Sequence, residues 1–200
     1  MRRKTSRGST GADARSAILG AAVALVRGGR GSLITTDEVA QRAECAKGLV
    51  HYHFKSKDQL LAAAAEKLWQ ERADSWGAAL TSVSPRASIG DAWKTLLKES
   101  SDGTSAASAA LGLRTEKLVV QSINNGRVAF ARGLTGALDK LLAQLGLEPS
   151  VPISALGALL VAVIEGIGLQ LGSGAAPDEM EQAWSAFWAG LLSLTEPRGT

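Results

Sequence analysis

The sequence predicts an all-α protein. Apolar residues recur at helical spacing along most of the chain, no segment alternates convincingly with a period of two, and no internal repeat is evident. Hydrophobic residues make up 46% of the 200 residues and charged residues 20%, which is typical of an ordinary globular protein with one core or two modules. The single cysteine, Cys45, cannot form an internal disulfide and fits a reducing cytoplasm.

A basic arm is predicted before the first helix. Residues 1–12 carry only basic charges, and the first acidic residue of the chain is Asp13. Such an arm either lies on DNA phosphates or is a plain solvated tail, and the sequence favours neither. A helix from Asp13 to Val26 follows, with Thr10 as a candidate cap and Gly28-Gly29 at its end.

Two short helices and a long one are predicted next. Thr35-Thr36-Asp37-Glu38 has the spacing of a capping box, in which the first and fourth residues satisfy each other's backbone N–H groups. The helix that it starts ends at a break at Glu44-Cys45, and a second short helix runs from about Lys47 to Tyr52. Ser56-Lys57-Asp58-Gln59 is another capping box, and it starts the long helix from Asp58 to Leu80.

Five further helical segments are predicted in the C-terminal part of the chain. Their apolar residues follow one face or, in the fourth segment, occupy nearly every position. Asn124-Asn125-Gly126 is expected to interrupt the third segment, because three weak helix formers follow one another there. The five segments are Ile89–Leu97, a short alanine-rich stretch that starts at Gly103-Thr104, Arg114–Leu145, Ile153–Leu171 and Asp178–Leu194.

The two short helices, with one helix before them and a longer one after, indicate a helix-turn-helix. This motif places its second helix in the DNA major groove while its first helix crosses the backbone. Hydroxyl and N–H groups at the start of the first helix can meet a phosphate, and lysines at the starts of the next two add cations. His51, Tyr52 and His53 offer hydrogen-bonding aromatic tips, and we interpret this cluster as presented to DNA.

A spaced set of residues between Asp13 and Ala64 carries a resemblance to a known family. The set comprises Ile18-Leu19, Ala21-Ala22, Thr35-Thr36, Val39-Ala40, Lys47-Gly48, His51-Tyr52-His53-Phe54, Ser56-Lys57 and Leu60-Leu61. It resembles the DNA-binding domain of the TetR family of transcriptional regulators. The resemblance implies a motif at 35–54 within a DNA-binding domain of residues 13–57, and it assigns residues 58–200 to ligand binding and dimerisation.

The same resemblance implies a function. It implies a cytoplasmic transcriptional repressor that binds a palindromic DNA operator as a homodimer and is released by a small molecule of unknown identity. The DNA contacts that it implies are Thr36, Lys47, Gly48, Leu49, His51, Tyr52, His53 and Lys57.

Four positions depart from the TetR pattern. In the turn of the motif, Glu44 replaces the usual glycine, and a positive φ at that position costs about 1 kcal/mol. Cys45 replaces a valine as a small buried substitute, and Ala46 replaces a serine cap at a cost of about 1 kcal/mol. His51 stands in place of a tyrosine, which leaves the base preference open. These losses are too small to undo the fold.

An effector pocket is predicted in the C-terminal part of the chain. Glu165-Gly166 after an apolar run loosely resembles the regulatory domain of choline-responsive repressors, but no ligand-specific motif accompanies the likeness. Glu165 either contacts the ligand or pairs with an arginine of the core or of the partner subunit. The predicted lining residues are Trp93, Leu97, Leu118, Gln121, Ser122, Ile123, Asn125 and Glu165.

The most apolar segment, Ile153–Leu171, is nearly long enough to cross a bilayer. Glu165 and Gln170 lie inside it, and it has neither basic flanks nor an aromatic belt. We therefore expect no membrane contact. Instead, this segment and Asp178–Leu194 are predicted to form a four-helix bundle with their symmetry mates in an Ω-shaped homodimer. The predicted anchors of this interface are Trp184, Phe187, Trp188 and Leu191.

Other functions have less support in the sequence. Cys45, His51 and His53 lack a nearby fourth zinc ligand, so neither a metal nor another cofactor is expected. No nucleophile-elbow, P-loop or dinucleotide-binding motif is present, and no catalytic residue is predicted. Two alternatives stay open. One is a constitutive, sequence-specific or architectural DNA-binding protein without an effector; the other, more remote, is an enzyme or carrier domain fused to a DNA-binding head.

Overall fold

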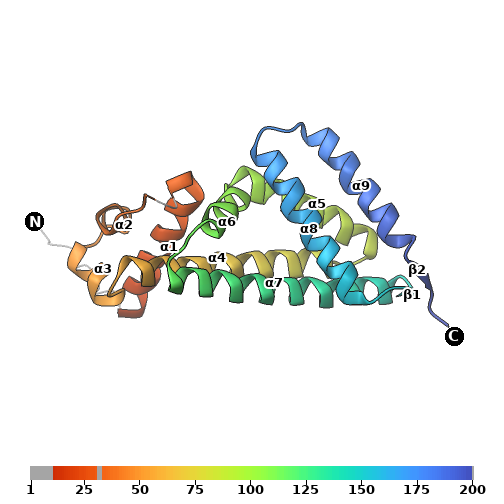
Figure 1. The fold of residues 1–200 in the computed structure, drawn as a ribbon, viewed down its shortest axis with the longest axis horizontal. Coiled ribbons are helices and arrows are strands. Elements are labelled where there is room, and N and C mark those ends of the chain that lie inside the picture. Colours follow the sequence, from red (N-terminus) through yellow and green to blue (C-terminus); the bar gives the residue numbers. More distant parts are fainter. Residues whose placement is uncertain (1–10, 31–32, 200) are drawn as a thin grey trace, which may run out of the picture.

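The computed structural model describes residues 11–30 and 33–199 and confirms the predicted all-α architecture (Figure 1). Three helices form one end of the elongated molecule, and a fourth runs from them along its length. We call α1 to α3 the head. These elements are α1 (Gly11–Leu25) with a π-helical turn η1 (Val26–Arg30), α2 (Thr36–Arg42), α3 (Lys47–His53) and α4 (Lys57–Leu80).

The remaining helices pack with α4 into what we call the body. The longest helix, α7, lies side by side with α4. The helices α5, α6, α8 and α9 all lie on one side of this pair (Figure 1). A short antiparallel pair of strands, which the sequence did not predict, joins the end of α7 to the segment after α9. These elements are α5 (Pro85–Ser101), α6 (Thr104–Gly112), α7 (Lys117–Gln144), β1 (Leu147–Pro149), α8 (Ile153–Gly172), α9 (Pro177–Leu192) and β2 (Thr195–Pro197).

The predicted capping box at Thr35 is confirmed. The N–H of Glu38 donates to Oγ1 of Thr35 at 3.2 Å, and the N–H of Thr35 donates to the carboxylate of Glu38 at 2.9 Å. At the start of α4, Oγ of Ser56 accepts from the N–H of Gln59, but the side chain of Gln59 accepts from the N–H of Lys55, so only the first half of the predicted box forms. The predicted cap Thr10 and most of the basic arm lie outside the described residues, while Gly11 and Ala12, expected in the arm, begin α1.

The predicted interruption at Asn124-Asn125-Gly126 was wrong, because α7 runs through it without a break. The glycine has a packing role instead. A Cβ at Gly126 would stand 2.6 Å from Cγ of Trp69, so only glycine allows α7 to approach α4 this closely. Tertiary packing therefore offsets the weak helix propensity of these three residues.

Two clusters of buried apolar residues stabilise the molecule. The cluster at the head end joins α1 to α3 to the first turns of α4, and side chains of α6 and α7 complete it. The second cluster fills the body and contains all five tryptophans. Because α4 contributes to both clusters, it connects the head mechanically to the body.

Among the described residues, α8 is the one helix long and apolar enough to cross a membrane by length and composition. A core helix of a globular protein passes the same test. One face of α8 is buried against the body through Leu156, Leu160, Ile164 and Ile167, and the opposite face is exposed.

Candidate nucleic-acid interface and effector region

The turn of the helix-turn-helix is built around Glu44. Its φ is 51°, and among the described non-glycine residues it alone has a positive φ, as the replacement of glycine at this position predicts. The N–H of Cys45 donates to the carbonyl of Ala40 at 3.0 Å and closes the turn. Ala46 caps α3 without a side-chain hydrogen bond, so the predicted loss of a cap is confirmed.

The helix α3 is held to the head by one face and open on the other. Val50 and the following Phe54 are buried in the head cluster, and the guanidinium of Arg15 lies 4.9 Å from the ring centroid of Phe54. On the open face, Tyr52 is 77% exposed and contacts the ring of His53 edge-on at 5.1 Å. A tyrosine this exposed gains nothing from burial inside the chain and is available to a partner.

The other residues predicted to contact DNA lie on α3 and at the starts of α2 and α4. Lys47, Gly48 and His51 are exposed, whereas Thr36, Leu49, His53 and Lys57 are half-buried. Leu49 also packs against the head cluster, so part of its side chain has a structural role.

One neighbour of this surface was missed by the sequence analysis. Nζ of Lys47 lies 2.8 Å from Oδ2 of Asp37, and both side chains are more than half exposed. The pair joins the first turn of α2 to the first turn of α3 across the helix-turn-helix. Ten residues separate the partners, and no periodic pattern links such a spacing to a contact.

The residues predicted to line an effector pocket do not converge. Trp93 and Leu97 belong to the body cluster, and Ile123 is buried in the head cluster. Ser122 is buried and donates to Glu66 at 3.0 Å. The prediction failed because it assumed a break in α7 that would have turned these side chains together. Leu118, Gln121 and Asn125 lie on the exposed face of α7, and the latter two border a shallow surface depression.

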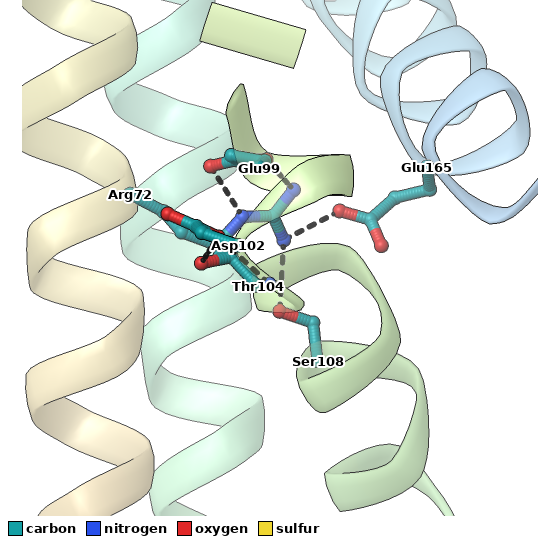
Figure 2. Close-up of polar contacts among 6 residues, drawn as sticks. All are labelled: Arg72, Glu99, Asp102, Thr104, Ser108 and Glu165. Carbon is teal, nitrogen blue, oxygen red and sulfur yellow. Dashed lines mark hydrogen bonds and ion pairs between the residues drawn. The ribbon is translucent and has the colours of Figure 1, made fainter. Parts of the chain in front are cut away.

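Glu165 belongs to a buried ionic network centred on Arg72 (Figure 2). Nε and Nη2 of Arg72 donate to the two oxygens of Glu99 at 3.0 and 2.9 Å. Nη1 donates to Oε1 of Glu165 at 2.7 Å and to Oγ of Ser108 at 3.3 Å. The network thus ties α4 to α5, α6 and α8, and the arginine partner that the sequence analysis considered for Glu165 is Arg72.

Burial decides the electrostatics of this network. Arg72 is 2% exposed and Glu99 5% exposed, whereas the side chain of Glu165 is 35% exposed. Burial raises the pKa of Glu99, against the hydrogen bond and charge of Arg72, which lower it. Burial alone would lower the pKa of Arg72, but its bonds and charge interactions with Glu99 and Glu165 outweigh burial and raise it. Arg72 therefore stays charged.

Two cavities border the network. An open cleft of about 700 Å³ runs between α4 and α5, with Arg72, Glu99 and Thr104 among its lining residues. A smaller pocket of about 230 Å³ lies between α4, α7 and α8 and is bordered by Trp69, Phe130 and Glu165. Among the described residues, no group of three or more His, Cys, Asp or Glu side chains is arranged to hold a metal ion.

The predicted anchors of the dimer were assigned to the wrong face of α9. Trp184, Trp188 and Leu191 are buried within the chain itself, and Phe187 is half-buried. The indole of Trp184 packs against Trp76 of α4 and Trp93 of α5, with ring centroids 6.3 and 6.4 Å apart. Large apolar side chains on an amphipathic helix satisfy the core of their own chain first. The outward residues of the second half of α9 are small, among them Ala183, Ala186, Ala189 and Gly190, whereas its first half exposes Asp178, Glu179 and Glu181.

Comparison with known proteins agrees with this architecture. Residues 18–64 match the model of the bacterial regulatory proteins of the tetR family. No curated protein matches the chain. The structure of reduced NemR from E. coli is 19% identical, with a TM-score of 0.76, and the match covers 94% of this chain and 100% of that one.

Two further solved structures share the fold. A TetR transcription regulator from Haloarcula marismortui is 18% identical, with a TM-score of 0.72, over 92% of this chain and 100% of its own. A protein from Saccharomonospora viridis in complex with choline is 19% identical, with a TM-score of 0.68, over 92% of this chain and 99% of its own. Residues 18–64 therefore carry a DNA-binding head of the tetR type, and the chain as a whole shares the fold of these regulators.

Proposed function

We propose that the protein is a repressor that binds a palindromic DNA operator as a homodimer and leaves it when a small molecule binds to the body. The observation that carries the proposal is the open face of α3, where Tyr52 and His51 are exposed on a helix whose other face is anchored in the head. Such a helix fits the major groove, and hydrogen-bonding side chains on its open face can read base edges. We assign DNA binding to a domain of residues 13–57, ligand binding and dimerisation to residues 58–200, and the protein to the cytoplasm.

The DNA contacts divide by chemistry. His51, Tyr52 and His53 are assigned to base edges, because their side chains donate and accept hydrogen bonds. Lys47 and Lys57 are assigned to phosphates, with Thr36 adding a hydroxyl at the start of α2. Gly48 lets the backbone of α3 approach the DNA, and Leu49 supplies an apolar contact beside its packing in the head.

Asp37 is expected to weaken DNA binding, because its carboxylate competes with phosphate for Lys47. Asp37→Asn is therefore expected to tighten binding to operator and unrelated DNA alike by about threefold, and to steepen the salt dependence. Fluorescence anisotropy titrations at several salt concentrations measure both quantities. Asp139→Asn removes an equal charge from the exposed face of α7 and serves as the control. Equal affinities for Asp37→Asn and the parent protein would contradict this role of Asp37.

A homodimer through α8 and α9 is supported by their outward faces. The exposed side of α8 carries Leu159 and Leu169 among small residues, and Glu165 is the one ionisable residue of this helix. Small residues let helices approach closely, and an uncharged apolar face of this length is costly to leave in water. Two such pairs related by a twofold axis form a four-helix bundle.

Leu159→Glu is expected to convert the dimer into a monomer, since it buries a carboxylate without a partner at the proposed interface. Sedimentation equilibrium measures the change as a halving of the mass. Val128→Glu is the matched control, because Val128 is an exposed apolar residue of α7 outside the outward face of α8 and α9. A monomeric parent protein, or a Leu159→Glu variant that stays dimeric, would exclude this interface.

A close contact between head and body supports release by an effector. Gly103 has a φ of 78°, and a Cβ there would stand 2.2 Å from the carbonyl oxygen of Arg27 in η1, the turn that follows α1. A shift of the α5–α6 junction therefore moves the head directly. Repression requires recognition helices about 34–36 Å apart in the dimer, and an effector that favours another state changes this spacing.

The function is tested by selecting binding sites from random duplex DNA with the purified protein. A palindromic consensus with two half-sites is expected, and a metabolite found by thermal shift is expected to release it. Selection of DNA without sequence preference would favour the architectural alternative. A specific consensus that no metabolite releases would favour the constitutive one.

A further inference from the structure

The pocket between α4, α7 and α8 combines an apolar, partly aromatic lining with one carboxylate, and this lining limits the kind of ligand that fits. Its lining is mainly apolar and includes the aromatic side chains of Trp69 and Phe130, with Val161 of α8 opposite. Its volume of about 230 Å³ is below the roughly 300–1,000 Å³ of drug-sized sites, so it suits a small molecule. Glu165 supplies the only carboxylate of the lining, and Arg127 is an exposed side chain at its edge.

The hydrogen bonds among the described residues of the network leave one acceptor oxygen of Glu165 free, so a ligand of this pocket should carry a hydrogen-bond donor. Arg72 is nearly saturated, because its nitrogens already donate to Glu99, Glu165 and Ser108. Glu165 uses one oxygen for Arg72, and its other oxygen has no hydrogen bond within the part of the chain that the structure describes. A half-exposed carboxylate therefore keeps free acceptor capacity at the pocket.

The charge of the network also favours a cationic ligand over an anionic one. Two carboxylates, Glu99 and Glu165, face one guanidinium in the network, which leaves an excess negative charge. The rings of Trp69 and Phe130 present electron-rich faces, which attract cations and disfavour anions. One cation already packs against them, since the guanidinium carbon of Arg72 lies 4.9 and 4.8 Å from their ring centroids. An anion in this pocket would meet only Arg127 as an available cation.

We propose that this pocket binds a small organic cation with an ammonium group, which pairs with Glu165 while its alkyl part contacts Trp69, Phe130 and Val161. The regulatory consequence rests on the proposed function. A bound ammonium competes with Arg72 for Glu165, and Arg72 also bonds Ser108 of α6. The helix α6 begins beside Gly103, which lies against the backbone of Arg27 in η1, next to α1 of the head. The pocket is thereby coupled to the head.

The test is a calorimetric titration of the full chain, without DNA, with n-butylammonium, tetramethylammonium and butyrate salts at constant ionic strength. Saturable binding of at least one ammonium ion and none of butyrate is expected. Glu165→Gln is expected to weaken ammonium binding at least tenfold, and Val161→Phe is expected to abolish it by filling the pocket while Glu165 remains. Glu148→Gln, which removes an exposed carboxylate of β1, is the matched control and is expected to bind as the parent does.

Three results would overturn the proposal. These are binding of butyrate alone, ammonium binding that survives both pocket variants, and no saturation by either ammonium up to about 50 mM. Circular dichroism verifies that each variant is folded, and Val161→Phe keeps the test decisive if Glu165→Gln unfolds. Operator binding by the unliganded protein is measured separately. If the cation site is absent, operator binding by the unliganded protein is still expected. If the protein does not bind DNA, the cation titration can still give a positive result.

Discussion

Arg72→Ala is expected to lower the free energy of unfolding by about 3–5 kcal/mol, because it leaves the carboxylate of Glu99 buried without its cation. The variant also loses the stacking of the guanidinium on Trp69 and Phe130. Urea unfolding followed by tryptophan fluorescence measures the loss, since all five tryptophans lie in the body cluster around this network. A loss of this size consumes much of the stability of an ordinary domain.

The control for this prediction is Arg86→Ala, which removes an exposed arginine from α5 and is expected to change the free energy of unfolding by less than about 0.5 kcal/mol. The double variant Arg72→Ala, Glu99→Ala removes the stranded charge as well, so it is expected to be more stable than Arg72→Ala alone. A single variant that loses less than about 1 kcal/mol would show that water reaches Glu99 and that the network is not buried in solution.

The head could be predicted from the sequence because its signals are local. The caps at Thr35 and Ser56 act over three residues, and both side chains accept the predicted backbone N–H. The break at Glu44 followed from a single unusual position, and its positive φ is present. Each signal specifies backbone geometry within one turn, so its interpretation does not depend on how distant helices pack.

The body could be predicted only as a set of helices. The apolar positions of α8 and α9 repeat on more than one face, and their sequence does not say which face meets the body and which meets a partner. Large residues such as Trp188 were therefore assigned to the dimer although they fill the core of their own chain. Gly126 was read as a helix breaker because its reason, the approach of Trp69, lies on a helix more than fifty residues earlier.

The network of Arg72 could not be found in the sequence for the same reason. Its three charged members lie on α4, α5 and α8, and 93 residues separate Arg72 from Glu165. The sequence could still raise the question, because Glu165 is the one ionisable residue of an otherwise uncharged helix and such a residue needs a partner. Which partner it has depends on the packing of four helices.

Tyr52→Ala is expected to weaken operator binding by about 1–3 kcal/mol, or about 5- to 150-fold, while the affinity for unrelated DNA changes little. The reason is that Tyr52 is exposed on the open face of α3, where its ring contacts His53 edge-on, so its removal costs the fold little. A base contact distinguishes sequences, whereas a phosphate contact weakens all DNA alike. Fluorescence anisotropy with the selected operator and with a scrambled duplex separates these effects.

Two further variants make this prediction specific. Tyr52→Phe keeps the ring and removes the hydroxyl, so a loss shared with Tyr52→Ala assigns the discrimination to a hydrogen bond, and a loss confined to Tyr52→Ala assigns it to ring contacts. Glu148→Ala changes an exposed side chain of β1, in the body, and is expected to leave both affinities unchanged. Because Val50 and Phe54 hold α3 from its other face, Tyr52→Ala should keep the melting temperature and the dimer of the parent. If operator affinity then stays within twofold of the parent, α3 does not read DNA through Tyr52, and the assignment of its open face to base edges is wrong.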